Sequence, residues 1–446
     1  MGRGLGGGVA PRSRSSLPIA NKEPPPVRIA DGRYHLTYCT NVHPGRDWPE
    51  TRAGLEEYLP PLRARFAPDA PFGVGLRLSG LASSQLLEGD ELARLRADLD
   101  VWGCYVFTMN GFPYGPFHGE TVKANVHAPD WRDEERVAYT LRMVDALAEL
   151  LPDGLDGGIS TSPLSYGAWV EPVTDAIWER LTANIVAVAD RLVRLHGERG
   201  VLIHLDIEPE PDGLLGDCAA LIDYFERWLL PAGGRLLAER FGIDPDAARA
   251  ELLDHVRVCF DTCHVAVGYE DPAGLLDRFA ALGIRVGKVQ ISSALKVAIP
   301  NDDALREDIA ASLRPFNDDT YLHQVIQRNA GGTLTRYPDL DDALPALADE
   351  ALPELADEAV TGDEPGRAEE WRVHFHVPIF VDRFDVFDST QDAILTTFAE
   401  LARRGDLTNH LEIETYTWDV LPAELKGDLL TSISREYEWV LRHVNG

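Results

Sequence analysis

The segment 256–264 ends a strand-like run in Asp261 and, three residues later, His264. Strand alternation puts the apolar residues of this run on one face and Asp261 on the other, at the carboxyl end of the strand. Barrel enzymes keep their catalytic groups at that end. A turn after Asp261 would bring the carboxylate and the imidazole toward one point, where they suit a divalent cation. A salt-bridged aspartate beside a capping histidine fits the pair equally well.

Three more segments repeat this design, with apolar residues on one parity and polar residues on the other. A parallel barrel normally fills its interior with branched apolar side chains, so polar residues on the inward parity indicate a site. An antiparallel sheet with one solvated face would show the same alternation, but helical segments separate nearly all these strands. The polar faces carry His204, Asp206 and Glu208 in 201–208, Lys288, Gln290 and Ser292 in 286–292, and Glu412 and Glu414 in 411–416.

Strands and helices alternate along the chain, which predicts an α/β (β/α)8 TIM barrel closed by a helix at about 422–444. One domain spans 31–446, and residues 1–30, rich in Gly, Arg, Ser and Pro, form a disordered leader without the apolar core of a signal peptide. The predicted barrel strands are 34–43, 72–79, 104–109, 157–162, 201–208, 256–261, 286–292 and 411–417.

An insertion at about 296–380 follows the seventh strand. It contains a hairpin, 321–329 with 333–337, and an acidic stretch, 339–370, that is either helical or disordered. A ninth strand, 371–378, has His374 and His376 on its polar parity. We expect this strand in a loop folded over the barrel mouth, from which either histidine reaches the site. An edge strand with surface histidines is the alternative.

Composition excludes some partners. The 446 residues include 73 acidic and 42 basic side chains, and the net charge of -31 repels nucleic acid and anionic membranes. No run approaches the roughly twenty apolar residues of a membrane helix. The five cysteines show no paired motif, which fits a reducing cytoplasm, and Cys263 is the one nearest the predicted chemistry. The sequence does not determine the oligomeric state, and a homodimer is one option.

Further polar residues near the predicted strand ends are candidates for binding a small molecule. Arg77 and Lys288 suit a substrate carboxylate or phosphate, although an inward arginine more often pairs with a core aspartate. Aromatic residues of the loop 110–119 suit a lid or a packed plug. The full set of candidate substrate-binding residues is His43, Asn41, Arg77, Asn110, His204 and Lys288.

Two resemblances follow from these motifs. Glu208, Asp261, His264 and Glu414 resemble the site of the xylose isomerase-like TIM barrels, the superfamily of sugar isomerases, epimerases and endonuclease IV. Within it, Cys259 to His264, followed by Gly268-Tyr269, looks like the endonuclease IV motif, and Glu414-Thr415 resembles its terminal Glu-Thr.

The segments 38–45, 108–115 and 158–166 are similar to motifs of the EboE family of metabolite-traffic proteins, over about residue 34 to the C-terminus. That resemblance implies a place in a bacterial cluster that makes or exports a small secondary metabolite.

The epimerase branch implies a divalent ion held by Glu, Asp, His and Glu, which fall here on Glu208, Asp261, Gln290 and Glu414. Gln290 departs from the pattern. An amide oxygen favours manganese or magnesium over zinc, unless His376 is recruited instead. The resemblance makes His264 a substrate contact or a metal ligand.

The sequence therefore predicts a metal-dependent isomerase or epimerase for a sugar-like or cyclitol-like metabolite, with Glu208, Glu414 and His264 as catalytic groups. A hydroxy-carbonyl substrate would lose and regain a proton between the two glutamates. A phosphoester hydrolase of the endonuclease IV type is one alternative, and it needs more histidines and, for DNA, a basic surface. A non-catalytic binder or carrier on the same barrel is the other.

Overall fold

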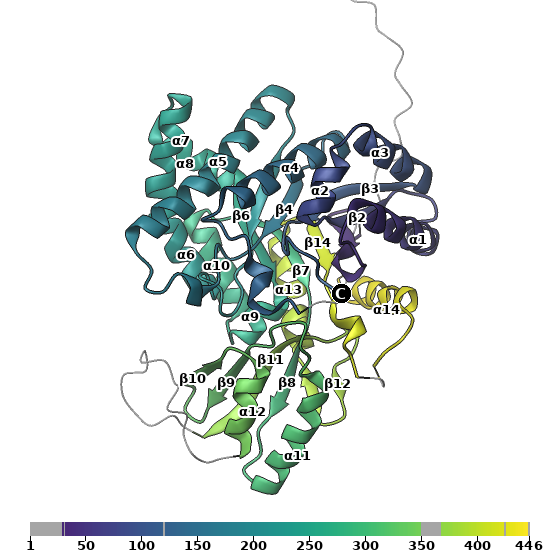
Figure 1. Cartoon of the computed structure of the whole chain (residues 1–446), viewed down its shortest axis with the longest axis vertical. Coiled ribbons are helices and arrows are strands. Elements are labelled where there is room, and N and C mark those ends of the chain that lie inside the picture. The colour runs from purple at the N-terminus through teal and green to yellow at the C-terminus, as the bar shows by residue number, and fades with distance from the viewer. Residues whose placement is uncertain (1–28, 31, 119–120, 349–366, 423–424, 445–446) are drawn as a thin grey trace, which may run out of the picture.

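The computed structural model describes residues 29–30, 32–118, 121–348, 367–422 and 425–444 (Figure 1). The predicted leader lies outside these residues except for its last positions, as does most of the acidic stretch, 349–366. None of the described helices is long and apolar enough to cross a membrane.

Eight parallel strands form the barrel, and the predicted α/β TIM barrel is confirmed. Their order is β1-β14-β7-β6-β5-β4-β3-β2, and each strand is buried along its whole length. The strands are β1 (His35–Tyr38), β2 (Phe72–Arg77), β3 (Cys104–Asn110), β4 (Gly157–Thr161), β5 (Ile203–Ile207), β6 (Val256–Asp261), β7 (Val286–Ile291) and β14 (His410–Ile413).

The seam between β1 and β2 closes largely through threonine side chains. The Thr37 hydroxyl accepts from the Gly75 amide at 2.7 Å, and the Thr40 hydroxyl accepts from the Arg77 amide at 2.8 Å. One parallel bridge, Cys39 to Gly75, joins the backbones directly. The chain after Tyr38 turns into a short 3-10 helix, Thr40–Val42, so the predicted strand 34–43 is too long.

Helices surround the barrel (Figure 1). Many begin at an aspartate whose carboxylate accepts a hydrogen bond from the first turn, including Asp217, Asp271 and Asp428. The helices are α1 (Trp48–Phe66), α2 (Gly80–Leu86), α3 (Glu91–Trp102), α4 (Glu134–Leu150), α5 (Asp175–Arg199), α6 (Cys218–Tyr224), the π-helix Phe225–Gly233, α7 (Gly234–Phe241), α8 (Pro245–His255), α9 (Thr262–Val267), α10 (Pro272–Leu282), α13 (Gln391–Arg404) and α14 (Leu429–His443).

A second, antiparallel sheet follows β7 and lies below the barrel in Figure 1. Its order is β10-β9-β11-β8-β13-β12, so the predicted ninth strand, β11, is interior rather than an edge. β11 packs against α9, directly after the barrel strand that ends in Asp261. The elements are β8 (Ala294–Ala298), α11 (Asp303–Leu313), β9 (Val325–Asn329), β10 (Leu334–Tyr337), α12 (Leu340–Ala348), β11 (Ala368–His376), β12 (Arg383–Phe384) and β13 (Phe387–Ser389).

The barrel interior is polar, and glycines make it possible. Lys288 donates to Glu412, and both side chains are fully buried. A Cβ on Gly75 would lie 2.1 Å from Oε1 of Glu412, and a Cβ on Gly287 would lie 1.8 Å from Oδ1 of Asp206. No carbon fits at those distances, so these strand positions accept only glycine while the charged groups stay in place.

The exchange Gly287→Ala tests this packing. We expect it to lower the free energy of unfolding by about 1–3 kcal/mol, because the new methyl group must displace a buried carboxylate. Gly197→Ala in α5 is the control, since nothing lies within 4 Å of its added Cβ, and it should gain about 0.5–1 kcal/mol. Urea unfolding measures both, and an equal response of the two variants would contradict the packing argument.

Candidate metal centre at the barrel mouth

Three carboxylates meet at the carboxyl ends of the barrel strands. Asp261 ends β6, while Glu208 and Glu414 directly follow β5 and β14. One oxygen from each lies within 4.8 Å of the others, and all three side chains are buried. Glu208 and Glu414 line a cavity of about 50 Å³ at the mouth. Sequence parity placed these residues inward, and the closed barrel brings them to one point.

Asp261 and Glu414 are each held by hydrogen bonds to one oxygen, and Asp261 and Glu208 each leave an oxygen open. Oδ1 of Asp261 accepts from the His264 amide (2.9 Å) and from the Ser292 hydroxyl (2.7 Å). Oδ2 of Asp261 and Oε2 of Glu208 have no hydrogen-bond partner among the described residues. The fixed oxygens orient the carboxylates, and the open ones are available to a cation.

The carboxylates lack matching positive charge. Burial raises the pKa of Glu208 well above its ordinary value, and the charges of Glu414, Asp261 and Glu210 raise it further. Burial likewise raises the pKa of Glu414, with Asp261 as the next cause. Within the described part of the chain no lysine or arginine forms an ion pair with any of them. A divalent cation would supply the missing charge and lower these raised pKa values.

His264 and His374 face each other through their Nε2 atoms, 3.1 Å apart. Nδ1 of His264 donates to the Pro209 carbonyl (3.0 Å), and Nδ1 of His374 donates to Oε1 of Gln324 (2.7 Å). The Gln324 amide is oriented by its own donation to Pro211. Both Nδ1 atoms therefore carry hydrogen, and two neutral rings would point lone pairs at each other. Two nitrogens on one zinc ion lie roughly 3.3 Å apart, so a shared cation fits this gap.

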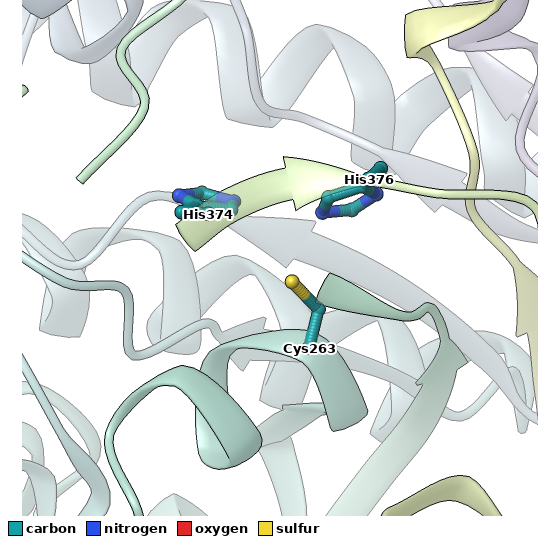
Figure 2. Close-up of side chains that lie close together, drawn as sticks. All are labelled: Cys263, His374 and His376. Atoms are coloured by element: carbon teal, nitrogen blue, oxygen red, sulfur yellow. The ribbon is translucent and has the colours of Figure 1, made fainter. Parts of the chain in front are cut away.

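His376 adds a third imidazole. Its Nδ1 donates to the Glu414 carbonyl at 2.8 Å, and its Nε2 is fully buried with no hydrogen-bond partner among the described residues. Figure 2 shows His374 and His376 at the end of β11, with Cys263 from α9 projecting toward them. Burial raises the pKa of the Cys263 thiol, and Asp261 adds to the effect, so the thiol stays protonated unless a metal binds it.

The ligand atoms fall into overlapping groups. His376 lies within 4.8 Å of Asp261 and His264, and His374 lies as close to His264 and Glu210. Because the groups share His264, the mouth can hold one or two adjacent cations. These residues fit a metal, and the mixture of imidazole and carboxylate suits zinc or manganese.

Gln290, the expected fourth ligand, is engaged elsewhere. Its Oε1 accepts from the Cys259 thiol at 2.7 Å, and the remaining amide nitrogen has no lone pair for a cation. His376 offers the open nitrogen in its place. The extra sheet therefore provides the imidazole that β7 lacks.

Two predicted substrate contacts lie near the mouth. Asn41 lines the cavity and donates to Oε1 of Glu414 at 2.9 Å, and Asn110 donates to the same oxygen at 3.0 Å. These amides orient Glu414.

Four other predicted substrate contacts are not among the residues that line this cavity. Arg77 donates to the carbonyls of Gly45, Pro113 and Gly115, which ties two loops together. His43 is buried beside Tyr38 and Tyr58.

Lys288 pairs with Glu412 inside the barrel, so it does not line the cavity. His204 lies near the amino end of β5, with Asp156, at the opposite end from the mouth. Strand parity predicts which face of the sheet a side chain lies on, but it does not give the position of that side chain along the barrel axis.

Sequence analysis missed Glu210 and left the choice between His374 and His376 open. The segment Glu208-Pro209-Glu210 repeats the inward parity beyond the end of β5, and that repetition was the available signal. Oε2 of Glu210 is buried without a hydrogen-bond partner among the described residues.

Comparisons with known proteins agree in fold only. No family model matches the sequence, and no curated protein matches it. The structure is similar to that of the IOLI protein with a bound zinc atom (10% identity, TM-score 0.43, 92% of this chain and 99% of that one). It is also similar to xylose isomerase domain proteins from Planctomyces limnophilus (13%, 0.41, 84% and 90%) and Alicyclobacillus acidocaldarius (12%, 0.40, 93% and 99%).

Metal binding provides a direct test of the site. Asn41→Ala should weaken zinc binding roughly 10–100-fold, because it removes one of the two amides that orient Glu414. Asp261→Asn should weaken zinc binding more, because it removes a ligand. Calorimetric titration of chelator-treated protein measures both. Asp254→Asn, at the other end of the barrel, is the matched control. Unchanged affinity in Asp261→Asn would refute the site.

The stability of the metal-free protein should depend on pH through Glu210. Burial raises the pKa of Glu210 from 4.5 to about 8, with help from the charges of Asp261 and Asp212. Because the folded-state pKa is the higher one, Glu210 stabilises the fold at pH values below 4.5 and loses this contribution as the pH rises through about 8. We expect the melting temperature of chelated protein to fall between pH 4.5 and about pH 8. In Glu210→Gln the fall should be smaller, and an equally steep fall would contradict the assignment.

Proposed function

We propose that this protein is a divalent-metal-dependent isomerase or epimerase acting on a small hydroxy-carbonyl compound of the sugar or cyclitol type. The observation that supports this proposal best is the meeting of Glu208, Asp261 and Glu414 beside a histidine with a free Nε2 at the barrel mouth. Glu208, Asp261, Glu414 and His376 would hold the cation, which when bound polarises the substrate carbonyl.

The two glutamates are suited to proton transfer. Glu208 removes the proton from the carbon next to the carbonyl, and the electron pair of that bond forms a carbon–carbon double bond as the carbonyl electrons move to oxygen. Glu414, which holds a proton when the step begins because its pKa is raised, delivers it from the other side, at the same carbon for epimerisation or at the neighbouring carbon for isomerisation. In isomerisation the hydroxyl proton also moves to the former carbonyl oxygen. The amides of Asn41 and Asn110 keep Oε1 of Glu414 in position during this step. No electrons are gained or lost overall.

An aromatic cover excludes water from the site. The rings of Phe117, Tyr321 and Tyr416 contact one another with centroids 5.0 to 5.1 Å apart. They come from the loop after β3, from the inserted region and from the segment after β14. The cavity beneath, about 50 Å³, is smaller than the roughly 300 Å³ of a typical ligand pocket. Substrate entry therefore requires these rings to move apart, and their return shields the proton-transfer step.

A second candidate function is metal-dependent phosphoester hydrolysis. It is favoured by the neighbouring group Glu210, His264 and His374, which can hold another cation next to the first. Two adjacent metal ions suit the in-line displacement at phosphorus. The motif resemblance to the EboE family adds a role in handling a secondary metabolite, and that role stays a prediction.

Deuterium incorporation tests the proposal. Zinc- or manganese-loaded protein is incubated in deuterated water with a panel of ketoses and cyclitol ketones, and exchange at carbon is followed by NMR. We expect exchange with at least one compound and a loss of roughly 10²–10⁴-fold in Glu208→Gln and Glu414→Gln. The metal content of each variant is measured as well. A variant that keeps its metal but loses exchange has lost the proton-transfer group, whereas one without metal has lost the ion.

The other outcomes are also informative. Cleavage of a phosphodiester that depends on His374, without carbon exchange, would favour the hydrolase. Metal and ligand binding without exchange or cleavage would favour a carrier. Full exchange in both glutamate variants would overturn the proposed mechanism.

A further inference from the structure

A second group of metal-binding side chains lies at the opposite end of the barrel. Asp156 directly precedes β4, His204 is the second residue of β5, and His410 is the first residue of β14. We infer that these three residues form a separate zinc site at the amino-terminal end of the barrel. This site is independent of the proposed reaction, because the mouth lies at the other ends of the same strands.

The distances suit a metal better than a hydrogen bond. Nε2 of His204 lies 3.8 Å from Oδ2 of Asp156, and Nε2 of His410 lies 3.7 Å from Oδ1. Both separations exceed the roughly 3.2 Å limit of a normal hydrogen bond. Ligand atoms on a tetrahedral zinc ion lie roughly 3.3 Å apart, so a small inward movement completes the geometry. The two imidazole rings stack with centroids 5.4 Å apart, so they lie next to each other.

The histidines present open nitrogens to this point. His410 is 1% exposed, and neither of its ring nitrogens has a hydrogen-bond partner among the described residues. His204 is fully buried, and its Nε2 is also without such a partner in the described part of the chain. Buried imidazole nitrogens normally have partners, and a zinc ion would satisfy both rings at once.

The surroundings orient the ligands as metal sites do. Nδ1 of His204 donates to Oδ1 of Asp206 at 2.6 Å, which fixes the tautomer that leaves Nε2 free. Asn409 donates to Oδ1 of Asp156 at 3.0 Å and holds that carboxylate at the site. A carboxylate behind a metal-bound histidine and a hydrogen bond to a ligating carboxylate are the usual supports of such sites.

A glycine that leaves room for His204 and an excess of negative charge both favour this arrangement. A Cβ on Gly158 would lie 2.7 Å from Cε1 of His204, so this position keeps the ring in place only as glycine. Arg257 approaches Oδ2 of Asp156 to 3.7 Å, outside hydrogen-bond distance, and its Nε donates to the Asp254 carbonyl instead. Two carboxylates, Asp156 and Asp206, therefore face one arginine, and the excess charge favours a cation.

An ion can reach the site from solvent. The side chain of Asp156 is 23% exposed and lines a surface groove of about 990 Å³ at this end of the barrel, together with Arg257 and Asn409. Three protein ligands leave the fourth position of a tetrahedral ion facing this groove, where water or a small anion can bind. Two imidazoles with one carboxylate favour zinc over magnesium or calcium.

Anomalous diffraction at the zinc absorption edge provides the test. Crystals of the full chain are soaked with zinc alone. We expect a peak about 2.0–2.2 Å from an oxygen of Asp156 and from both Nε2 atoms. In solution, Asp156→Asn and His410→Gln should each lose about one zinc equivalent per chain by elemental analysis. Asp254→Asn, which removes an equal charge from the same groove, should lose none.

The mouth variant Asp261→Asn separates this inference from the proposed function. It should retain the peak at the amino-terminal end while losing zinc at the mouth. Absence of a peak beside Asp156 in wild-type crystals, or wild-type zinc content in Asp156→Asn, would overturn the inference and leave the mouth site untouched. If His410→Gln does not fold, the zinc content of Asp156→Asn decides the result, because Asp156 is partly exposed.

Discussion

The structure depends on an excess of buried carboxylates inside a closed barrel. Asp206, Glu412, Asp261 and Glu414 project from the strands or their ends, and Lys288 pairs with just one of them, Glu412. An ionised carboxylate without a partner is costly in a low-dielectric interior, so it must be neutralised by a proton or a cation. Both ends of the barrel combine such carboxylates with histidines whose open nitrogens can share a metal ion.

The rest of the barrel accommodates these groups. Gly75 and Gly287 leave room for Glu412 and Asp206, and the hydroxyls of Thr37 and Thr40 close the seam that the glycine-containing strand would leave weak. The outward faces of the same strands carry the branched apolar residues that pack against the helices. The fold therefore keeps an ordinary hydrophobic core outside the strands and uses the inside for polar chemistry.

The inserted sheet completes the mouth. Gln290 occupies the place on β7 where the resemblance implied a histidine, and its oxygen is bonded to Cys259. β11 instead brings His374 and His376 to α9, where the Nε2 atoms of His264 and His374 meet. An insertion far along the chain thus contributes to a site whose carboxylates come from the barrel, and its tyrosine Tyr321 contributes to the aromatic cover.

Alternation along each strand determined the barrel and the inward position of Glu208, Asp261 and Glu414, because side-chain direction in a strand has a period of two residues. Alternation carries no information about depth, so His204 and Lys288 were expected at the mouth, whereas His204 lies at the far end and Lys288 pairs inside the barrel. It also says nothing about which distant segments meet. Only the folded chain decided that His376 approaches Asp261 while Gln290 bonds to Cys259, and that Asp156 approaches His410. Such contacts depend on barrel closure and on the placement of the inserted sheet.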